Sequence, residues 1–242
     1  MTAPTAEAAL IQVRGLTKTY GLLPVLRGLN LDIQRGESVA LLGSNGSGKS
    51  TFIRIISALS KPTSGTITVG GWELPREAAA VRAQIGMVAH KPLLYENLTA
   101  LENLRFFARL YHIPSADARI DALLQQVGLA RRAHDLVRTF SRGMLQRLAI
   151  ARALLHDPEV LLFDEPHTGL DQDAAAMLDL VVLEQRAHGR TVLMTTHELE
   201  RAARLSSRIL ILTRGVINCD VPSAGMSAAE LAALYAEKAS VR

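Results

Sequence analysis

A glycine-rich loop between two strongly patterned segments constrains the fold of this chain more than any other feature. Residues 43–51 read GSNGSGKST; they follow the continuous apolar run Ser38–Leu42, and Ser50–Leu59 continues with helical spacing. The loop matches G-x-x-x-x-G-K-[ST], in which glycines aim successive backbone N–H groups at an anion and the next helix adds its positive N-terminal end. The sequence therefore predicts a buried strand, a phosphate-binding loop and a helix.

The residues of this loop have expected parts in binding phosphates. Lys49 would supply a full positive charge to the outer phosphates of a nucleotide, and the Ser50 hydroxyl would ligate Mg²⁺. The residues expected to surround the phosphates are Gly43, Ser44, Asn45, Gly46, Ser47, Gly48, Lys49, Ser50 and Thr51. Taken alone, the loop predicts that the chain binds a nucleoside triphosphate.

A pair of acids ends a second apolar run. Residues 160–166 read VLLFDEP, and a buried strand would place these acids at the carboxyl edge of a parallel sheet, where ligands bind. Asp164 is predicted to hold Mg²⁺, directly or through water, and Glu165 to act as the base or water-orienting residue beside the terminal phosphorus. Because a solvated strand end has the same appearance, this prediction depends on the loop upstream.

The N-terminal part of the chain has the pattern of an antiparallel meander. Short strand-like runs between residues 11 and 33 are split by Gly15, Gly21 and Gly28. Glycine and neighbouring polar residues are the usual punctuation between such strands. We therefore predict an antiparallel β subdomain made of short strands.

The remainder divides into a helical block and an alternating segment. Apolar residues recur at helical spacing over about residues 92–150, and from residue 160 strand-like and helical runs alternate. Alternation of this kind favours a parallel sheet flanked by helices. We predict an α/β fold in one domain over residues 10–242, with an α-helical insertion, a C-terminal helical tail at about 227–242 and a flexible segment at 1–9.

Composition limits the compartment and the class of partner. The longest apolar stretches run to about five residues, whereas a membrane span needs roughly 20, and the N-terminus has no secretory pattern. The single cysteine fits a reducing compartment. The net charge of +4 is attributed to a solvated arginine-rich surface, since no basic run with interleaved aromatics appears, and no direct nucleic-acid partner is expected.

Four further motifs follow in a fixed order along the chain. Phe140–Arg147 reads FSRGMLQR, Thr168–Asp171 reads TGLD, His197 follows the run TVLMTT, and Tyr20 ends the run LTKTY. Taken singly, Ser141 and Gly143 would be a helix cap and a turn, His197 a helix N-terminal residue and Tyr20 a strand aromatic. In this order the motifs resemble those of the ATP-binding subunit of an ABC transporter, and the resemblance covers residues 10–220.

The resemblance implies a P-loop NTPase (RecA-like) core that binds ATP with Mg²⁺. Tyr20 would stack on adenine, and Asp171 would lie in the loop that follows the catalytic acid. His197 would contact the terminal phosphate from the same subunit, while Ser141 and the backbone near Gly143 would reach it from the partner subunit. Lys49, Glu165 and His197 would together carry out ATP hydrolysis.

The resemblance also implies partners. The chain would form a head-to-tail homodimer, or pair with a related ATPase subunit, with two shared ATP sites that close on binding and reopen on hydrolysis. Separate multi-span membrane subunits would complete the transporter, and this chain would lie peripherally at the cytoplasmic face of the membrane.

Two positions depart from the family pattern. The family usually has a glutamine that contacts Mg²⁺ and the attacking water, and here His90 stands in its place, followed by Lys91. His90 would either take over that role or face the membrane partner or solvent. In the signature, Arg142 and Met144 replace the usual Gly and Gln. Arg142 would either reach a phosphate in the partner subunit or pair with a surface acid.

The cargo is less constrained than the family. The run from His90 to Tyr111 and the SRGM signature resemble the haem-exporter ATPase of the cytochrome c maturation system, although ATPases that export drugs or polysaccharides share SRGM-type signatures. A soluble ABC ATPase acting on nucleic acid or ribosomes is the competing class; its usual coiled coil or second cassette is not evident here. A non-hydrolysing regulator is disfavoured by the presence of Glu165 and His197.

Overall fold

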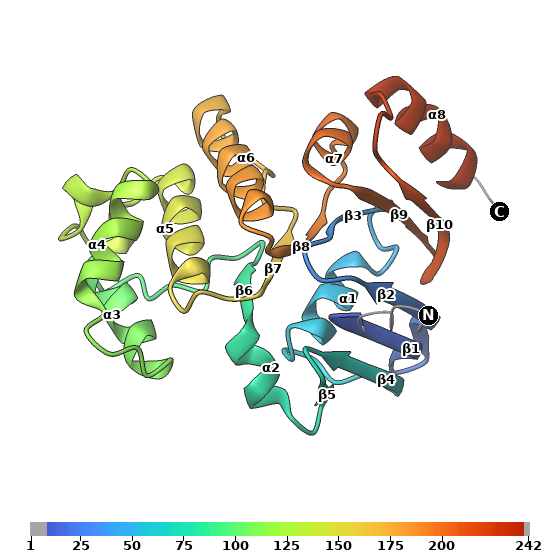
Figure 1. Cartoon of the computed structure of the whole chain (residues 1–242), viewed down its shortest axis with the longest axis horizontal. Helices are drawn as coiled ribbons and strands as arrows, with labels where there is room; N and C mark the ends of the chain where they lie inside the picture. The colour runs from blue at the N-terminus through green and yellow to red at the C-terminus, as the bar shows by residue number, and fades with distance from the viewer. Residues whose placement is uncertain (1–8, 240–242) are drawn as a thin grey trace, which may run out of the picture.

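Two β-sheets organise the structure, a computed structural model that describes residues 9–239 (Figure 1). The larger sheet has six strands in the order β10-β9-β3-β8-β7-β6. These strands are β3 (Ser38–Leu42), β6 (Ile85–Val88), β7 (Val160–Asp164), β8 (Thr191–Thr195), β9 (Arg208–Thr213) and β10 (Val216–Pro222). Neighbours from β9 to β6 are parallel, and β10 pairs antiparallel with β9. The predicted α/β fold with a mostly parallel sheet is confirmed.

The two faces of this sheet belong to different hydrophobic cores. On β3, Val39 and Leu41 join one core, whereas Ala40 and Leu42 join another, and the whole strand is buried. Strands buried on both faces need the continuous apolar runs that the sequence shows. Helix α1 (Lys49–Ile56) packs in the first core together with the smaller sheet.

The opposite face of the large sheet is covered by three helices (Figure 1). These are α6 (Gln172–Ala187), α7 (Leu199–Leu205) and α8 (Ala228–Ala239). Helix α8 lies within the predicted C-terminal tail. Residues 240–242 of that tail, and residues 1–8 of the segment predicted to be flexible, lie outside the described residues.

The smaller sheet is antiparallel, with the order β2-β1-β4-β5. Its strands are β1 (Ile11–Tyr20), β2 (Leu23–Ile33), β4 (Ser64–Val69) and β5 (Trp72–Leu74). The prediction that Gly15 and Gly28 separate short strands is wrong, because β1 and β2 run through them. Both glycines have positive φ angles, and the pairing register shifts beside each. They act as β-bulges within long strands, and Gly21 alone of the three lies in the turn.

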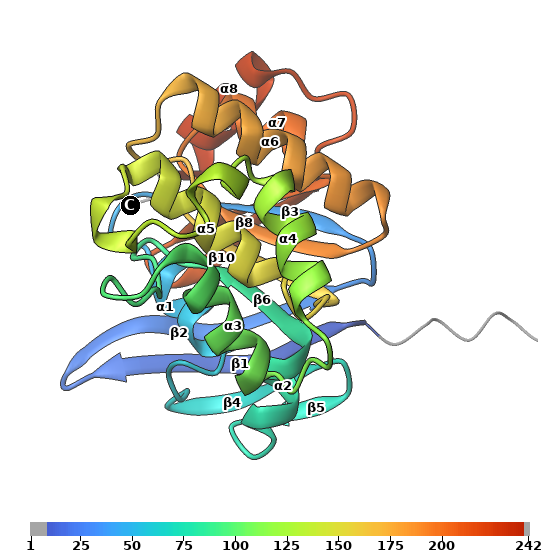
Figure 2. The ribbon, with the colours of Figure 1, turned by 90° about the vertical axis from the view of Figure 1, so that its left-hand side faces the viewer.

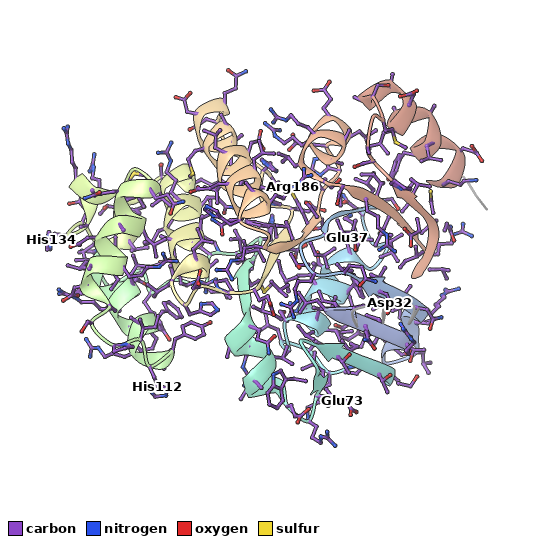
Figure 3. All side chains as sticks on the ribbon, viewed as in Figure 1. Asp32, Glu37, Glu73, His112, His134 and Arg186 are labelled. Carbon is purple, nitrogen blue, oxygen red and sulfur yellow. The ribbon has the colours of Figure 1, made fainter. Side chains whose placement is uncertain are left out.

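An arginine joins the two sheets. Arg208 on β9 donates to the backbone oxygen of Asp32 on β2 at 2.9 Å and to the Glu37 carboxylate at 3.1 Å, and its other nitrogens bond Asp220 on β10. These carboxylates, Asp220 foremost, raise the pKa of Arg208, so it stays charged. Figure 3 labels Asp32 and Glu37 on the side of the molecule where the sheets meet.

The helical block lies beside the β6 edge of the large sheet in Figure 1 and in front of that sheet in Figure 2. It contains α3 (Ala100–Leu110), α4 (Asp117–Gln126) and α5 (Arg142–Leu154). Thr99 caps α3 in a reciprocal pair with Glu102. Helix α5 approaches β6 so closely that a Cβ atom on Gly86 would lie 2.3 Å from the Ala153 oxygen.

Two strands and one α-helix lie outside the elements that the sequence predicts. They are β5, α2 (Ala78–Gln84) and β6, which are short and have weak apolar periodicity. None of the helices within residues 9–239 combines the length and apolar character needed to cross a membrane.

Candidate nucleotide-binding site

The loop between β3 and α1 lines a hollow of about 460 Å³. The lining residues are Leu23, Val25, Asn45, Gly46, Gly48, Lys49, Ser50, Thr51 and Glu165. Lys49 is 5% exposed, and its ammonium donates to the backbone oxygen of Gly43 at 2.8 Å and to that of Ser44 at 3.3 Å. The structure therefore gathers the predicted loop around one positively charged group at the N-terminus of a helix.

Two of the glycines are required by close packing of the loop. A Cβ atom on Gly43 would lie 2.4 Å from the Leu212 oxygen, and one on Gly48 would lie 2.7 Å from a methyl carbon of Leu26. Gly48 also has a φ angle of +111°, which favours glycine. Ser47 has a buried hydroxyl without a hydrogen-bond partner among the described residues. The loop is thus packed closely against Leu26 of β2 and Leu212 of β9.

The acidic pair is tied to the loop through a threonine that the sequence analysis missed. Asp164 Oδ1 accepts hydrogen bonds from Ser50 Oγ at 3.0 Å and from Thr195 Oγ1 at 2.9 Å. The Glu165 N–H donates to the same threonine hydroxyl at 2.9 Å. Thr195 ends β8, which lies next to β7. The available signal was a polar residue at the carboxyl end of an apolar run.

Glu165 lies between the two other predicted catalytic residues. Its Oε1 is 3.3 Å from Lys49 Nζ, and its Oε2 is 3.8 Å from His197 Nδ1. The backbone of Glu165 has a φ angle of +48°, an uncommon conformation for a residue other than glycine. The His197 side chain is 60% exposed, so it is open to an incoming group. The structure brings these three side chains together.

The signature motif forms a second hollow, of about 230 Å³, whose lining shares no residue with the first. Ser141 caps α5 by accepting the Met144 N–H at 3.3 Å. Asp171 caps α6 by accepting the Ala174 N–H at 2.8 Å, and a Cβ atom on Gly143 would lie 3.3 Å from Ala174 Cβ. The N-termini of α5 and α6 therefore line this hollow together.

Arg142 contacts the loop that leads into α6. A Cβ atom on Gly169 would lie 2.4 Å from Arg142 Nη1. Over residues 9–239, Arg142 has no ion pair with an acid, so the expected pairing with a surface carboxylate is not seen in this part of the chain. The Arg142 guanidinium instead packs against Gly169 in the TGLD segment.

Tyr20 and His90 lie at the margins of the site. Tyr20 is 49% exposed at the end of β1; its register partner Leu23 lines the phosphate hollow, and the Lys18 ammonium lies 4.7 Å from its ring centroid. His90 is exposed two residues beyond β6, which pairs in parallel with β7. His90 therefore lies beyond the carboxyl edge of the sheet, where the acidic pair Asp164 and Glu165 also lies.

The strand, loop and helix, with acids at the end of β7 across the intervening strand β8, define a P-loop nucleoside triphosphatase. Comparison with known proteins narrows this class. Residues 26–168, more than half of the chain, match the family model described as ABC transporter. The chain belongs to the ABC transporter family, as an ATP-binding subunit with ATPase function.

Relatives with longer chains share this cassette. The chain is 39% identical over 208 residues to the linearmycin resistance ATP-binding protein LnrL of Bacillus subtilis, covering 85% of this chain and 67% of that one. It is 42% identical over 207 residues to the daunorubicin resistance ATP-binding protein DrrA3 of Streptomyces coeruleorubidus, with 85% and 66% covered. It is 38% identical to a Nod factor export ATP-binding protein I of Cupriavidus pinatubonensis over 212 residues, with 87% and 65% covered.

Solved structures agree with the fold. An ATP-binding subunit of an ABC transporter superposes with a TM-score of 0.86 at 33% identity, covering 94% of this chain and all of that one. The ATP-binding cassette MJ0796, in a dimeric post-hydrolysis state bound to ADP and Pi, superposes with a TM-score of 0.83 at 30% identity, covering 89% of this chain and all of that one.

We predict that Thr195→Val destabilises the protein, whereas Thr195→Ser does not. Valine keeps the volume but removes the hydroxyl that bonds Asp164 and Glu165, leaving a buried acceptor short of a partner at a cost of about 1–3 kcal/mol. Urea unfolding measures the free energy of unfolding of each variant. Equal stability of the valine variant and the parent would contradict the assigned role of the hydroxyl.

Proposed function

We propose that this chain powers export through separate multi-span membrane subunits, as a homodimer or paired with a related ATPase subunit, at the cytoplasmic face of the membrane. The observation that carries the proposal is that both acids meet the phosphate loop: Asp164 bonds Ser50, and Glu165 lies beside Lys49 and lines the same hollow as the loop. The resistance and export functions in the names of relatives support the transport role.

ATP fits the hollow because its phosphates would replace contacts that Lys49 makes with its own loop and with Glu165. These contacts include two backbone oxygens and one carboxylate oxygen, at 2.8–3.3 Å. A triphosphate would instead meet the Lys49 ammonium and the N-terminal end of α1. Adenine would extend toward the end of β1, where Tyr20 is exposed for stacking.

Mg²⁺ fits the pair Ser50 and Asp164. Their side-chain oxygens lie 3.0 Å apart, and oxygen donors of this kind, completed by water and phosphate, are what Mg²⁺ prefers. We assign these two residues as its ligands from the protein. The ion would supply positive charge that offsets the charge on the phosphates.

Glu165 and His197 are proposed to act on the water and the terminal phosphate. The Glu165 carboxylate, held by its backbone bond to Thr195, orients or deprotonates the attacking water. His197, 3.8 Å from that carboxylate, contacts the terminal phosphate. Lys49 holds the same phosphate from the loop side.

The separate signature hollow supports a site shared between two subunits. Ser141 and the N–H groups near Gly143 lie at the N-terminus of α5, a natural place for an anion. We propose that they meet the terminal phosphate of ATP held by the partner, with Arg142 and Asp171 beside them. The dimeric arrangement of the related cassette MJ0796 supports this pairing.

The cargo proposed first is a drug-like or lipophilic natural product, because the relatives named above include resistance and Nod factor export proteins. Haem export for cytochrome c maturation is the second candidate. It is supported by the run that begins at His90 and by the SRGM signature, whereas none of the relatives named here is a haem exporter.

We predict that Glu165→Gln traps an ATP-bound dimer. The amide cannot act as a base, so hydrolysis should fall about 100-fold or more while ATP is still held by the loop and the partner's signature. Size-exclusion chromatography with light scattering, with and without ATP and Mg²⁺, measures the dimer. Adding Lys49→Ala should abolish it, and a variant that stays monomeric with ATP argues against shared sites.

We predict that His90→Gln raises ATP turnover of the assembled transporter, because glutamine is the usual residue at this water-handling position. His134→Gln is the matched control, since His134 is also exposed but lies on the outer side of the helical block (Figure 3). Steady-state ATP turnover of each variant is measured at several pH values between about 6 and 9. Identical rates and pH profiles for parent and His90→Gln would remove His90 from catalysis.

The class of partner is tested by recovery of the tagged chain from gently solubilised membranes. A multi-span protein should be recovered in a fixed ratio with the chain and should stimulate its ATPase activity when reconstituted in lipid. Recovery with ribosomes or DNA, and none with a membrane protein, would replace the transporter proposal with the soluble class.

A further inference from the structure

A buried carboxylate on α6 lies between the two segments that carry Glu165 and His197. Asp179 is 5% exposed, and its Oδ1 accepts a hydrogen bond from His167 Nε2 at 2.8 Å. Arg204 pairs with Oδ2, and Arg201 Nε lies 3.4 Å from Oδ1. All three partners come from outside α6, so this one carboxylate joins three parts of the chain.

One partner belongs to the turn that carries the acid. His167 lies two residues beyond Glu165. The Thr168 N–H donates to the backbone oxygen of Glu165 at 3.2 Å, so residues 165–168 form a hydrogen-bonded turn. Burial lowers the pKa of His167 despite the opposing effect of Asp179. The ring is therefore neutral near pH 7 and donates its Nε2 proton to Asp179. Its Nδ1 is buried without a partner among the described residues.

The other partners lie on the helix that follows His197. Arg201 pairs with Glu198 as well as with Asp179. Glu198 is the residue next to His197, and its N–H donates to Thr196 Oγ1 at 3.0 Å. The Asp179 carboxylate thus contacts both the first turn of α7, which follows His197, and the turn that carries Glu165. Helices α6 and α7 are neighbours in Figure 1.

We propose that Asp179 is a positioning residue for ATP hydrolysis. It would hold the Glu165 turn and the His197 segment in register, and this inference rests on the proposed function. Buried ion clusters contribute less stability than apolar packing of the same volume, and the adjacent α6 residues Leu178 and Val182 are apolar and fully buried. Directional bonds fix an orientation that apolar contacts would leave free, and such orientation is what a water-activating pair requires.

Two substitutions of His167 separate positioning from packing. His167→Phe keeps an aromatic ring but loses the bond to Asp179, whereas His167→Gln keeps an N–H near the position of Nε2. In the transporter purified with its membrane subunits, we expect kcat of the phenylalanine variant to fall about tenfold, with KM for ATP changed less than about twofold. The glutamine variant should stay within about threefold of the parent in kcat.

Asp179→Asn should reproduce the loss of kcat, and Glu184→Gln, an exposed charge-matched change on the same helix, should not. Parent-like kcat in both His167→Phe and Asp179→Asn would overturn the inference. Equal losses in the phenylalanine and glutamine variants, together with lower unfolding temperatures, would also overturn it by marking a structural role. If the parent complex itself hydrolyses no ATP, the proposed function fails and this inference with it.

Discussion

The carboxylate of Asp164 is the contact on which the rest of the site depends. One of its oxygens accepts hydrogen bonds from Ser50 on α1 and from Thr195 on β8, so a single atom connects the phosphate loop with two neighbouring strands. Because Asp164 and Thr195 are buried, these bonds lie where electrostatic interactions are strong and unpaired groups are costly. The same arrangement positions Glu165, because the Glu165 backbone N–H donates a hydrogen bond to Thr195 Oγ1.

The parts predictable from the sequence are those whose chemistry demands particular residue types at fixed spacing. Gly43 and Gly48 are needed because neighbouring atoms leave no room for a side chain, and Lys49 and Ser50 follow at set positions. Strands β3, β7 and β8 were recognisable because burial on both faces leaves a continuous apolar run. Such signals are local, and a single sequence displays them.

The parts that escaped prediction depend on contacts between distant segments. Thr195 can bond Asp164 only because β8 pairs with β7 in this register. The residues near Thr195 in the chain do not indicate which strand it pairs with. The sequence predicts a break at Gly15 because glycine is common in turns, whereas in the structure Gly15 forms a bulge within the paired strands. Asp179 would read as one polar residue of an amphipathic helix until His167 and Arg204 are placed against it.

The phosphate loop and the signature line separate hollows of the same chain, as the proposed sharing of each ATP between two subunits requires. The most direct test is a crystal structure of the Glu165→Gln variant with ATP and Mg²⁺. Shared sites predict two copies of the chain, with each triphosphate held between Lys49 of one copy and Ser141 of the other. ATP bound to one chain alone, with Ser141 facing solvent, would contradict it.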